Sequence, residues 1–352
     1  MTEFYRNKKV LITGHTGFKG TWLCKILLNF NSNIVGVSLD APTIPNLFEI
    51  TNVKQNIKHY ICDIRNLKQL KEIFEKEQPE IIFHLAAQPI VRESYINPVY
   101  TYETNVMGTV NILECIRNST TVKSFLNITT DKVYKNKEWE WGYRENEELN
   151  GFDPYSNSKS CSELVTESYK NAFFNNSDIS ISTARAGNVI GGGDFASDRI
   201  IPDCIRAMQN NVPIIVRNPH SIRPYQHVLE PLYAYLVIAK EQYKNKSYAG
   251  SYNIGPNETD CITTGDLVDI FCAEWGQGAT WENKETNGPH EANFLKLDCS
   301  KVKKVFGIAP LWNINRAIKE TIEWTKVYFN HDNINKCMDN QIQRYLVGGY
   351  NE

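Results

Sequence analysis

The sequence predicts an α/β protein built on a doubly wound parallel sheet, with a smaller C-terminal α/β lobe. Short apolar runs alternate with helical segments up to about residue 185, as in a parallel sheet that helices cover on both faces. After residue 186 this alternation stops and a glycine-rich loop begins. We therefore expect a first domain over residues 1–185, with 225–255 returning to it. A smaller domain would comprise residues 186–224 and 256–352.

The composition is that of a globular protein: 41% of the 352 residues are apolar and 22% are charged. A net charge of -2 predicts no nucleic-acid partner, and no apolar run is long enough to predict a membrane partner. The N-terminal residues lack the apolar core of a secretory signal. Nine cysteines without paired spacing favour reduced, buried thiols rather than disulfides or zinc. We expect a cytoplasmic protein with no metal site.

The first elements suit a dinucleotide. Residues 8–13 are predicted to form a buried strand and 21–28 an amphipathic helix. Between them lies a Gly-x-x-Gly-x-x-Gly loop made of Gly14, His15, Thr16, Gly17, Phe18, Lys19 and Gly20. Glycines there let backbone amides approach a pyrophosphate, and the helix N-terminus favours its charge. The sheet is therefore predicted to be of the Rossmann type.

The next two strands bear on the choice of cofactor. The strand at 33–39 carries Ser38 where an acidic residue would bind the adenosine ribose, and Asp40 follows two residues later. His15 and Lys19 suit contact with a phosphate, so NADP is an alternative to NAD as the cofactor. The strand at 59–64 ends at Asp63, which suits either an adenine amino group or the N-cap of a helix.

The fourth strand, residues 80–87, ends in small side chains that would let a ring lie against the backbone. Gln88 and Ser94 continue into a loop above the strand ends, the edge that carries ligands in open α/β sheets. A helix is expected over 104–117. Within it, Asn105 suits either cofactor contact or a buried role in which it bonds backbone groups.

Titratable groups gather after the fifth strand, residues 122–129. Thr130, Asp131 and Lys132 follow it, and a polar, aromatic loop over 135–148 is expected to cover them. The helix predicted over 153–169 carries Tyr155 and Lys159, one turn apart on one face. A phenol has a pKa of about 10, and a fixed cation lowers that value, so this pair suits proton transfer. A sixth strand is expected at 179–185.

The second half predicts a helix at 200–209, a strand at 213–216, and helices at 230–241 and 312–329. Arg217 and Arg223 suit a diphosphate, because forked guanidinium donors match phosphate oxygens, although surface salt bridges are the plainer alternative. Residues 289–292 and the 312–329 helix are expected to build the smaller lobe. The Asn-rich residues from about 330 are expected to be loosely packed.

These motifs together resemble the extended short-chain dehydrogenase/reductases over almost the whole chain. The motifs are the glycine loop, Leu85-Ala86-Ala87 and Tyr155-x-x-x-Lys159. Thr130-Asp131-Lys132 is similar to the nucleotide-sugar 4,6-dehydratases, most of which carry Thr-Asp-Glu. Lysine at position 132 resembles their CDP-glucose 4,6-dehydratase subgroup.

The resemblance implies a cycle in which the sugar is oxidised at carbon 4, loses water across carbons 5 and 6, and is reduced again. It implies Tyr155 as the base at carbon 4, Lys159 as the holder of the nicotinamide ribose, and Thr130 as a donor to the same sugar oxygen. Asp131 would be the acid that releases water. Lys132 replaces the glutamate base of relatives, and suits either a neutral base or a cation that stabilises an enolate.

The resemblance also implies NAD, a nucleotide-sugar substrate, a homo-oligomer (dimer or tetramer), and a place in deoxysugar and lipopolysaccharide biosynthesis. The expected cofactor contacts are Gly14, His15, Thr16, Gly17, Phe18, Lys19, Gly20, Asp63, Ile64, Leu85, Ala86, Ala87, Thr104, Thr129, Tyr155 and Lys159. The expected substrate contacts are Gln88, Ser94, Asn188, Arg217 and Arg223. The rivals are a 4-epimerase, a dehydratase for another nucleotide sugar such as a heptose, and a cofactor-sensing protein without catalysis.

Overall fold

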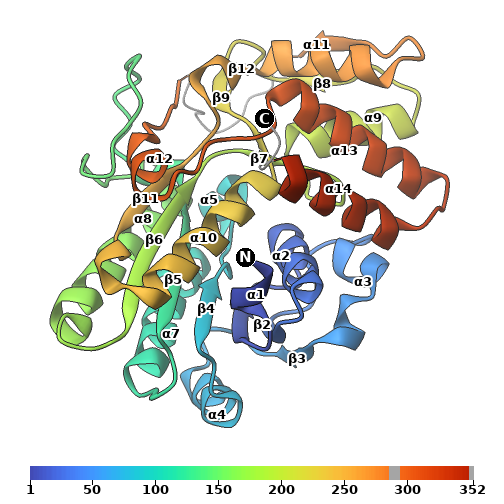
Figure 1. The fold of residues 1–352 in the computed structure, drawn as a ribbon. Helices are drawn as coiled ribbons and strands as arrows, with labels where there is room; N and C mark the ends of the chain where they lie inside the picture. Colours follow the sequence, from blue (N-terminus) through green and yellow to red (C-terminus); the bar gives the residue numbers. More distant parts are fainter. Residues whose placement is uncertain (285–293, 349–352) are drawn as a thin grey trace.

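A seven-stranded parallel sheet forms the centre of the protein, as the computed structural model shows for residues 1–284 and 294–348 (Figure 1). The strand order is β11-β6-β5-β4-β1-β2-β3, and each neighbouring pair is parallel. This confirms the predicted fold class, with the order reversal of a Rossmann sheet between β1 and β4. The strands are β1 (Lys9–Thr13), β2 (Asn33–Ser38), β3 (Lys58–Ile61), β4 (Ile81–His84), β5 (Ser124–Thr130), β6 (Ser180–Ala186) and β11 (Ser251–Ile254).

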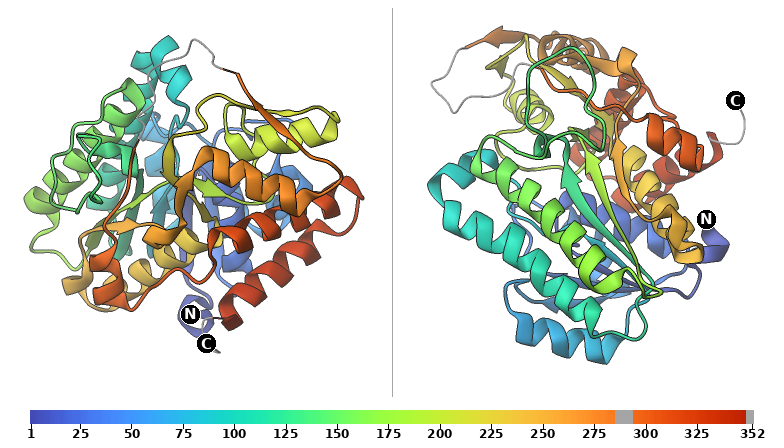
Figure 2. Two further views of the ribbon diagram at one scale, coloured as in Figure 1. Left: turned by 90° about the horizontal axis from the view of Figure 1, so that it is seen from above. Right: turned by 90° about the vertical axis from the view of Figure 1, so that its left-hand side faces the viewer.

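Helices cover both faces of this sheet because its central strands are apolar on both sides (Figure 2). On β1, Val10 and Ile12 face one hydrophobic core and Leu11 faces the other. The first core includes residues of α1 (Thr2–Tyr5), α2 (Phe18–Asn29), α3 (Leu47–Thr51) and α10 (Leu229–Lys244). The second includes residues of α4 (Leu67–Glu77) and α7 (Gly108–Arg117), with α8 (Pro154–Tyr169) packed against it.

The predicted 104–117 helix is interrupted. Helix α5 (Val91–Ile96) and helix α6 (Pro98–Tyr102) lead into a π-helical turn, η2 (Glu103–Met107), before α7 begins. Asn105 lies in this turn, where its side chain accepts from Gln88 N at 2.8 Å and donates to Gln88 O at 3.1 Å. The buried, backbone-bonding role is therefore the one that the structure shows for Asn105.

The smaller lobe continues directly from β6 through β7 (Val189–Ile190), so it lies at the carboxyl end of the sheet (Figure 1). Its core joins apolar residues of α9 (Ile200–Gln209), β8 (Ile214–Val216), α11 (Thr264–Trp275) and α13 (Ile314–Phe329). Its other elements are β9 (Ile222–Pro224), β10 (Gln226–His227), β12 (Cys261–Thr263) and β13 (Trp281–Asn283). Helix α12 (Ser300–Phe306) instead packs against β11 and adds Val302 to the first core of the large sheet. The predicted contribution of residues 289–292 lies outside the described residues.

The expectation of a loose C-terminal segment is wrong. Residues Ile334–Gly348 form helix α14, which packs against α13 and α2. Ile334, Met338, Ile342 and Tyr345 recur at helical spacing and are buried. This apolar face stabilises the helix despite the polar asparagines on its other side.

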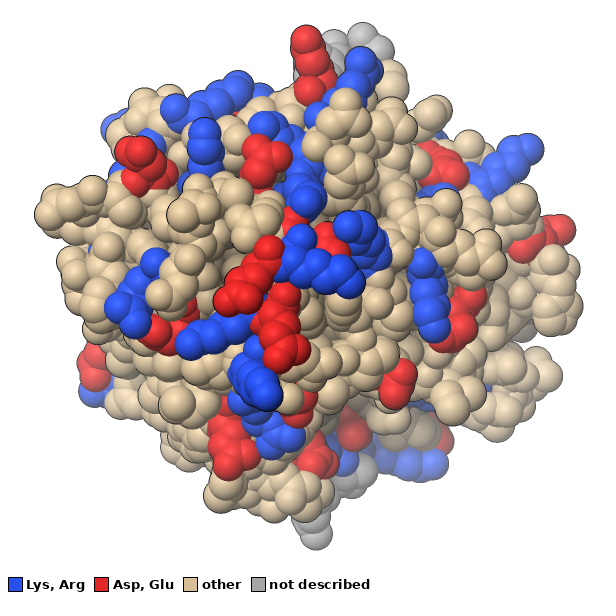
Figure 3. Space-filling view, turned by 90° about the horizontal axis from the view of Figure 1, so that it is seen from below, with Lys and Arg blue, Asp and Glu red and all other residues tan. Residues whose placement is uncertain are grey.

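The drawn surface is mixed in charge, and most of the thiols are buried. On the face drawn in Figure 3, basic and acidic side chains are interspersed. All nine cysteines are free, and six of them are buried. Within the described residues, no helix is both long and apolar enough to cross a membrane.

Candidate active site

The glycine loop forms a close cradle at the carboxyl end of β1. Gly14 has φ +74°, and a Cβ there would lie 2.8 Å from Ala86 N. A Cβ at Gly20 would overlap the Gly14 carbonyl oxygen, so this position also excludes a side chain. Gly17 is the N-cap of α2 and offers no side-chain hydrogen bond to the first turn. The amides of that turn are therefore available to an anion such as a pyrophosphate.

His15 and Lys19, both expected to meet a phosphate, have different surroundings in the structure. His15 is buried, its Nε2 lies 2.7 Å from His59 Nδ1, and burial with the neighbouring imidazole lowers its pKa to about 3. It therefore brings no positive charge at neutral pH. Lys19 has Arg199, Asp131 and Lys159 as electrostatic neighbours, which places it at the catalytic end. Burial is the main cause that lowers the pKa of Lys19 to about 8.

Asp63 and Thr104 are two of the predicted cofactor contacts. Asp63 accepts from Arg65 N at 2.9 Å and pairs with the Arg65 guanidinium at 2.8 Å. The N-cap of α4 is Asn66, so the alternative of Asp63 as a helix cap is wrong. Thr104 Oγ1 is buried without a hydrogen-bond partner among the described residues. Such a hydroxyl suits a polar ligand group.

Tyr155 lies in the first turn of α8. This helix is capped by Asp153, which accepts from Ser156 N at 2.9 Å, and Pro154 occupies its first position. Burial raises the pKa of Tyr155 to about 12, while a hydrogen bond with Thr130 and the Arg199 charge act in the opposite direction. The net effect is a raised pKa, because desolvation of the phenolate outweighs the side chains that lower it. This differs from the expectation of a lowered pKa for Tyr155 beside Lys159.

Lys159 reaches the neighbouring strand from one turn further along α8. Its side chain is buried and its Nζ donates to Ile128 O at 3.0 Å. Burial lowers its pKa to about 8, and the charge of Glu163 raises it. The ammonium form therefore dominates at neutral pH.

Thr130 links the phenol to a carboxyl group. Its hydroxyl donates to Asp131 Oδ1 at 2.9 Å and also hydrogen-bonds with Tyr155, although its one proton serves one of them at a time. Asp131 is 1% exposed, and burial raises its pKa, with the charge of Lys132 the largest opposing effect. Asp131 Oδ2 has no partner among the described residues. A buried carboxyl group with a raised pKa and an unpartnered oxygen thus lies close to Tyr155.

The predicted substrate contacts fall into two groups. Gln88 is buried, with its Oε1 accepting from Ile90 N at 2.6 Å and its Nε2 donating to Thr101 Oγ1 at 2.9 Å. Ser94 is buried too and donates to Val91 O at 2.6 Å. Both side chains are thus engaged within the protein.

Asn188, Arg217 and Arg223 lie in the smaller lobe. Arg217 pairs with Asp198 at 3.0 Å and lines an open cavity of about 430 Å³ together with Arg92 and Arg206. The buried Arg223 is among the charges that lower the pKa of Asp131.

Comparison with known proteins decides the family. A family model described as GDP-mannose 4,6 dehydratase matches residues 11–325. A CDP-glucose 4,6-dehydratase of Salmonella typhimurium is 45% identical over 350 residues, which cover 98% of each chain. The chain belongs to the nucleotide-sugar 4,6-dehydratases. This family lies within the extended short-chain dehydrogenase/reductases, as the motifs predicted.

More distant dehydratases and epimerases share the fold. The human dTDP-D-glucose 4,6-dehydratase is 27% identical over 346 residues, covering 94% of each chain. A dTDP-glucose 4,6-dehydratase from Bacillus anthracis, solved with NAD, gives a TM-score of 0.75 at 21% identity and covers 91% of this chain and 96% of its own. A UDP-glucose 4-epimerase from Thermotoga maritima gives 0.80 at 21% identity, covering 91% and 99%.

Sequence reasoning missed two ion pairs in this dehydratase. Arg199, at the N-cap of α9, donates to the buried Asp194 at 2.8 Å, and its charge opposes the raised pKa of Tyr155. Glu163 and Arg185 form a buried pair at 3.0 Å on α8 and β6. Glu163 and Arg185 lie on different elements, so the sequence indicates neither their contact nor their burial. The one signal is that position 163 follows Lys159 by one helical turn.

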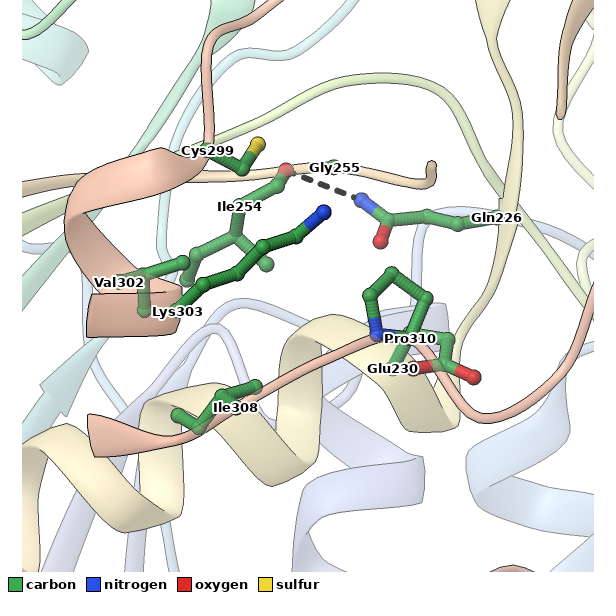
Figure 4. Close-up of a pocket in the computed structure, with 9 residues that line it drawn as sticks. All are labelled: Gln226, Glu230, Ile254, Gly255, Cys299, Val302, Lys303, Ile308 and Pro310. Atoms are coloured by element: carbon green, nitrogen blue, oxygen red, sulfur yellow. Dashed lines mark hydrogen bonds between the residues drawn. The ribbon is translucent and has the colours of Figure 1, made fainter. Parts of the chain in front are cut away.

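A second cavity of the dehydratase is too small for a substrate. It measures about 10 Å³, room for one water, and Gln226, Glu230 and Lys303 are among its lining residues (Figure 4). Gln226 Nε2 donates to Ile254 O at 3.2 Å across it. None of the predicted catalytic residues lines this cavity.

Proposed function

We propose that the chain converts CDP-glucose to CDP-4-dehydro-6-deoxyglucose with bound NAD. The observation that carries the proposal is Asp131, a buried carboxyl with a raised pKa and an unpartnered oxygen beside Thr130 and Tyr155. An epimerase needs no acid for carbon 6, whereas a dehydratase does. The 45% identity with a CDP-glucose enzyme supports the choice of substrate.

The dinucleotide would lie across the glycine cradle. The uncapped first turn of α2 would hold its pyrophosphate, and Lys159 its nicotinamide ribose. NAD would take up the hydride from carbon 4 and return it at carbon 6, and its positive ring would lower the pKa of Tyr155. The remaining proposed contacts are His15, Thr16, Phe18, Lys19, Asp63, Ile64, Leu85, Ala86, Ala87, Thr104 and Thr129.

Tyr155 would take the proton from the hydroxyl at carbon 4. Thr130 would hydrogen-bond with the same oxygen, since its hydroxyl lies beside the phenol. The charge of Arg199 favours the phenolate and thus the loss of that proton.

Asp131 would give its proton to the hydroxyl at carbon 6, which leaves as water. Its raised pKa keeps this carboxyl a donor, as general acid catalysis requires. Lys132 lies beside it, since its charge is the largest that opposes the raised pKa of Asp131. We assign Lys132 the stabilisation of negative charge that develops on the sugar when carbon 5 gives its proton to a water molecule acting as the base.

Arg217, Arg223 and Asn188 would bind the nucleotide and diphosphate in the smaller lobe. The cavity beside Arg217 has the size of small-molecule sites and carries three guanidinium groups. Forked donors of this kind match phosphate oxygens. For Gln88 and Ser94 we propose a supporting role, because their polar atoms bond within the protein.

We also propose that the protein is a cytoplasmic homo-oligomer, a dimer or tetramer. Val99, Met107 and Leu164 are exposed on α6, η2 and α8, which contact one another. A shared apolar face of this kind suits a second copy of the chain. Sedimentation of the purified protein would test this, with a monomer as the contradicting result. Free thiols support a reducing compartment.

A panel of nucleotide sugars tests the substrate. With CDP-glucose and NAD we expect a 4-keto-6-deoxy sugar and no net NADH. Conversion of another nucleotide sugar, such as a heptose, with CDP-glucose unchanged would refute the substrate. A product epimerised at carbon 4 would refute dehydration. Binding without turnover of any sugar would favour a cofactor-sensing protein.

A further inference from the structure

We propose that Glu163 is a positioning residue for the catalytic lysine: its buried carboxylate keeps Lys159 charged and in place beneath Tyr155. The two side chains project from one face of α8, one turn apart. Both are almost fully buried. They reach adjacent residues of β5, since Lys159 Nζ donates to Ile128 O and Glu163 Oε1 accepts from Thr129 Oγ1.

The Glu163 carboxylate is held from the opposite side by β6. Arg185 Nε donates to Oε1 at 3.0 Å and Arg185 Nη2 to Oε2 at 3.0 Å. Thr183 Oγ1 donates to Oε2 at 2.7 Å. A bidentate guanidinium and two hydroxyl donors satisfy the buried carboxylate and leave it little freedom to move.

Glu163 is the charge that acts on the pKa of Lys159, and Arg185 is not among its causes. The remaining contacts of Arg185 lie away from Lys159. Its Nη1 donates to Tyr134 OH at 2.7 Å and to Glu145 O at 2.9 Å. Tyr134 OH in turn donates to Asn253 Oδ1 at 2.6 Å. The arginine thus also ties α8 to the loop over residues 135–148.

Other titratable groups around Lys159 come from several elements. These are Tyr155 on the same helix, Asp131 after β5, Lys19 on α2, His84 on β4 and Arg185 on β6. His84 is neutral, since burial lowers its pKa to about 3, and burial raises the pKa of Asp131. Among the described residues, Glu163 is therefore the carboxylate that offsets the burial of the Lys159 ammonium group.

Nitrogen NMR of labelled lysine side chains tests this directly, with Lys159→Met to assign the signal. In Glu163→Gln we expect Lys159 to titrate about one pH unit lower than in the parent protein. Glu163→Asp keeps the negative charge, so Lys159 in this variant should titrate near its midpoint in the parent protein. An unchanged midpoint in folded Glu163→Gln would overturn the proposal.

The inference rests on the proposed function only where it gives Lys159 a catalytic task. In Glu163→Gln, the alkaline limb of kcat/KM for CDP-glucose should move to lower pH by the same amount as the NMR midpoint. A purely structural role would instead lower kcat/KM equally at every pH. If CDP-glucose is not turned over, the proposed function fails, while the NMR midpoint still decides the role of Glu163.

Two further variants guard against misfolding. Combining Glu163→Gln with Arg185→Gln removes the uncompensated guanidinium, and a lowered Lys159 midpoint is again expected. Ser182→Ala is the matched control, because Ser182 is buried on β6 but bonds with Gln242 and Gly250 instead. If Ser182→Ala shifts the Lys159 midpoint as Glu163→Gln does, the effect is not specific to Glu163 and the proposal fails.

Discussion

Gly187 directly follows β6 and leaves the space that the Asp131 carboxyl occupies. A Cβ at this position would lie 3.0 Å from Asp131 Oδ2 and 2.5 Å from Pro224 Cγ, both below an ordinary contact of 3.4 Å. Gly187→Ala should therefore displace the carboxyl by a few tenths of an ångström. Because a misplacement of about 1 Å costs about 100-fold in rate, we expect dehydration to slow by roughly 10- to 100-fold.

The oxidation at carbon 4 should survive in Gly187→Ala, because Tyr155 is not among the atoms nearest to the added methyl group. Rapid mixing with CDP-glucose would then show a transient rise in the absorbance of reduced nicotinamide, since elimination becomes the slow step. Gly265→Ala is the matched control, because the atoms nearest to its Cβ all belong to Pro219, with Pro219 O at 3.2 Å, away from the carboxyl. Equal slowing of oxidation and elimination in Gly187→Ala, or no slowing, would refute the reasoning.

Three further predictions concern ionisable groups. Burial raises the pKa of Glu230 from 4.5 to about 7, so it stabilises the fold below pH 4.5 and this stability is lost as pH rises through 7. Urea unfolding at pH 5 and pH 8 should show a fall of about 3 kcal/mol that Glu230→Gln removes, and an equal fall in the variant would contradict this. Asp131→Asn should lower turnover by about 10²- to 10⁴-fold yet raise thermal stability at neutral pH, because the raised pKa makes the ionised carboxyl costly; a lower melting temperature would be the opposing result. Lys132→Glu should abolish turnover while oxidation at carbon 4 and substrate binding persist; retained turnover would instead identify position 132 as a base.

Local patterns in the sequence predicted the sheet and brought the candidate catalytic groups to its carboxyl edge. The glycine loop, Thr130-Asp131-Lys132 and the Tyr155–Lys159 spacing each lie within a few residues, so their shared location follows from strand and helix periodicity. The Asn-rich end was misjudged because composition outweighed the helical spacing of Ile334 and Met338.

Effects of burial could not be predicted from the same patterns. The sign of the pKa shift of Tyr155 depends on desolvation, and desolvation depends on the packing of distant segments. The pairing of Glu163 with Arg185 likewise needs α8 and β6 side by side. The separation of His15 from Lys19 follows from the contact of His15 with His59, far along the chain.

In the proposed cycle, one active site removes hydride from carbon 4 and returns it to carbon 6 of the same sugar. CDP-glucose that carries deuterium at carbon 4, incubated with the protein and unlabelled NAD, tests this transfer. We predict that the product carries the deuterium on its carbon 6 methyl group. A 4-keto-6-deoxy product without deuterium on carbon 6, or an epimerised sugar that keeps deuterium at carbon 4, would contradict this transfer.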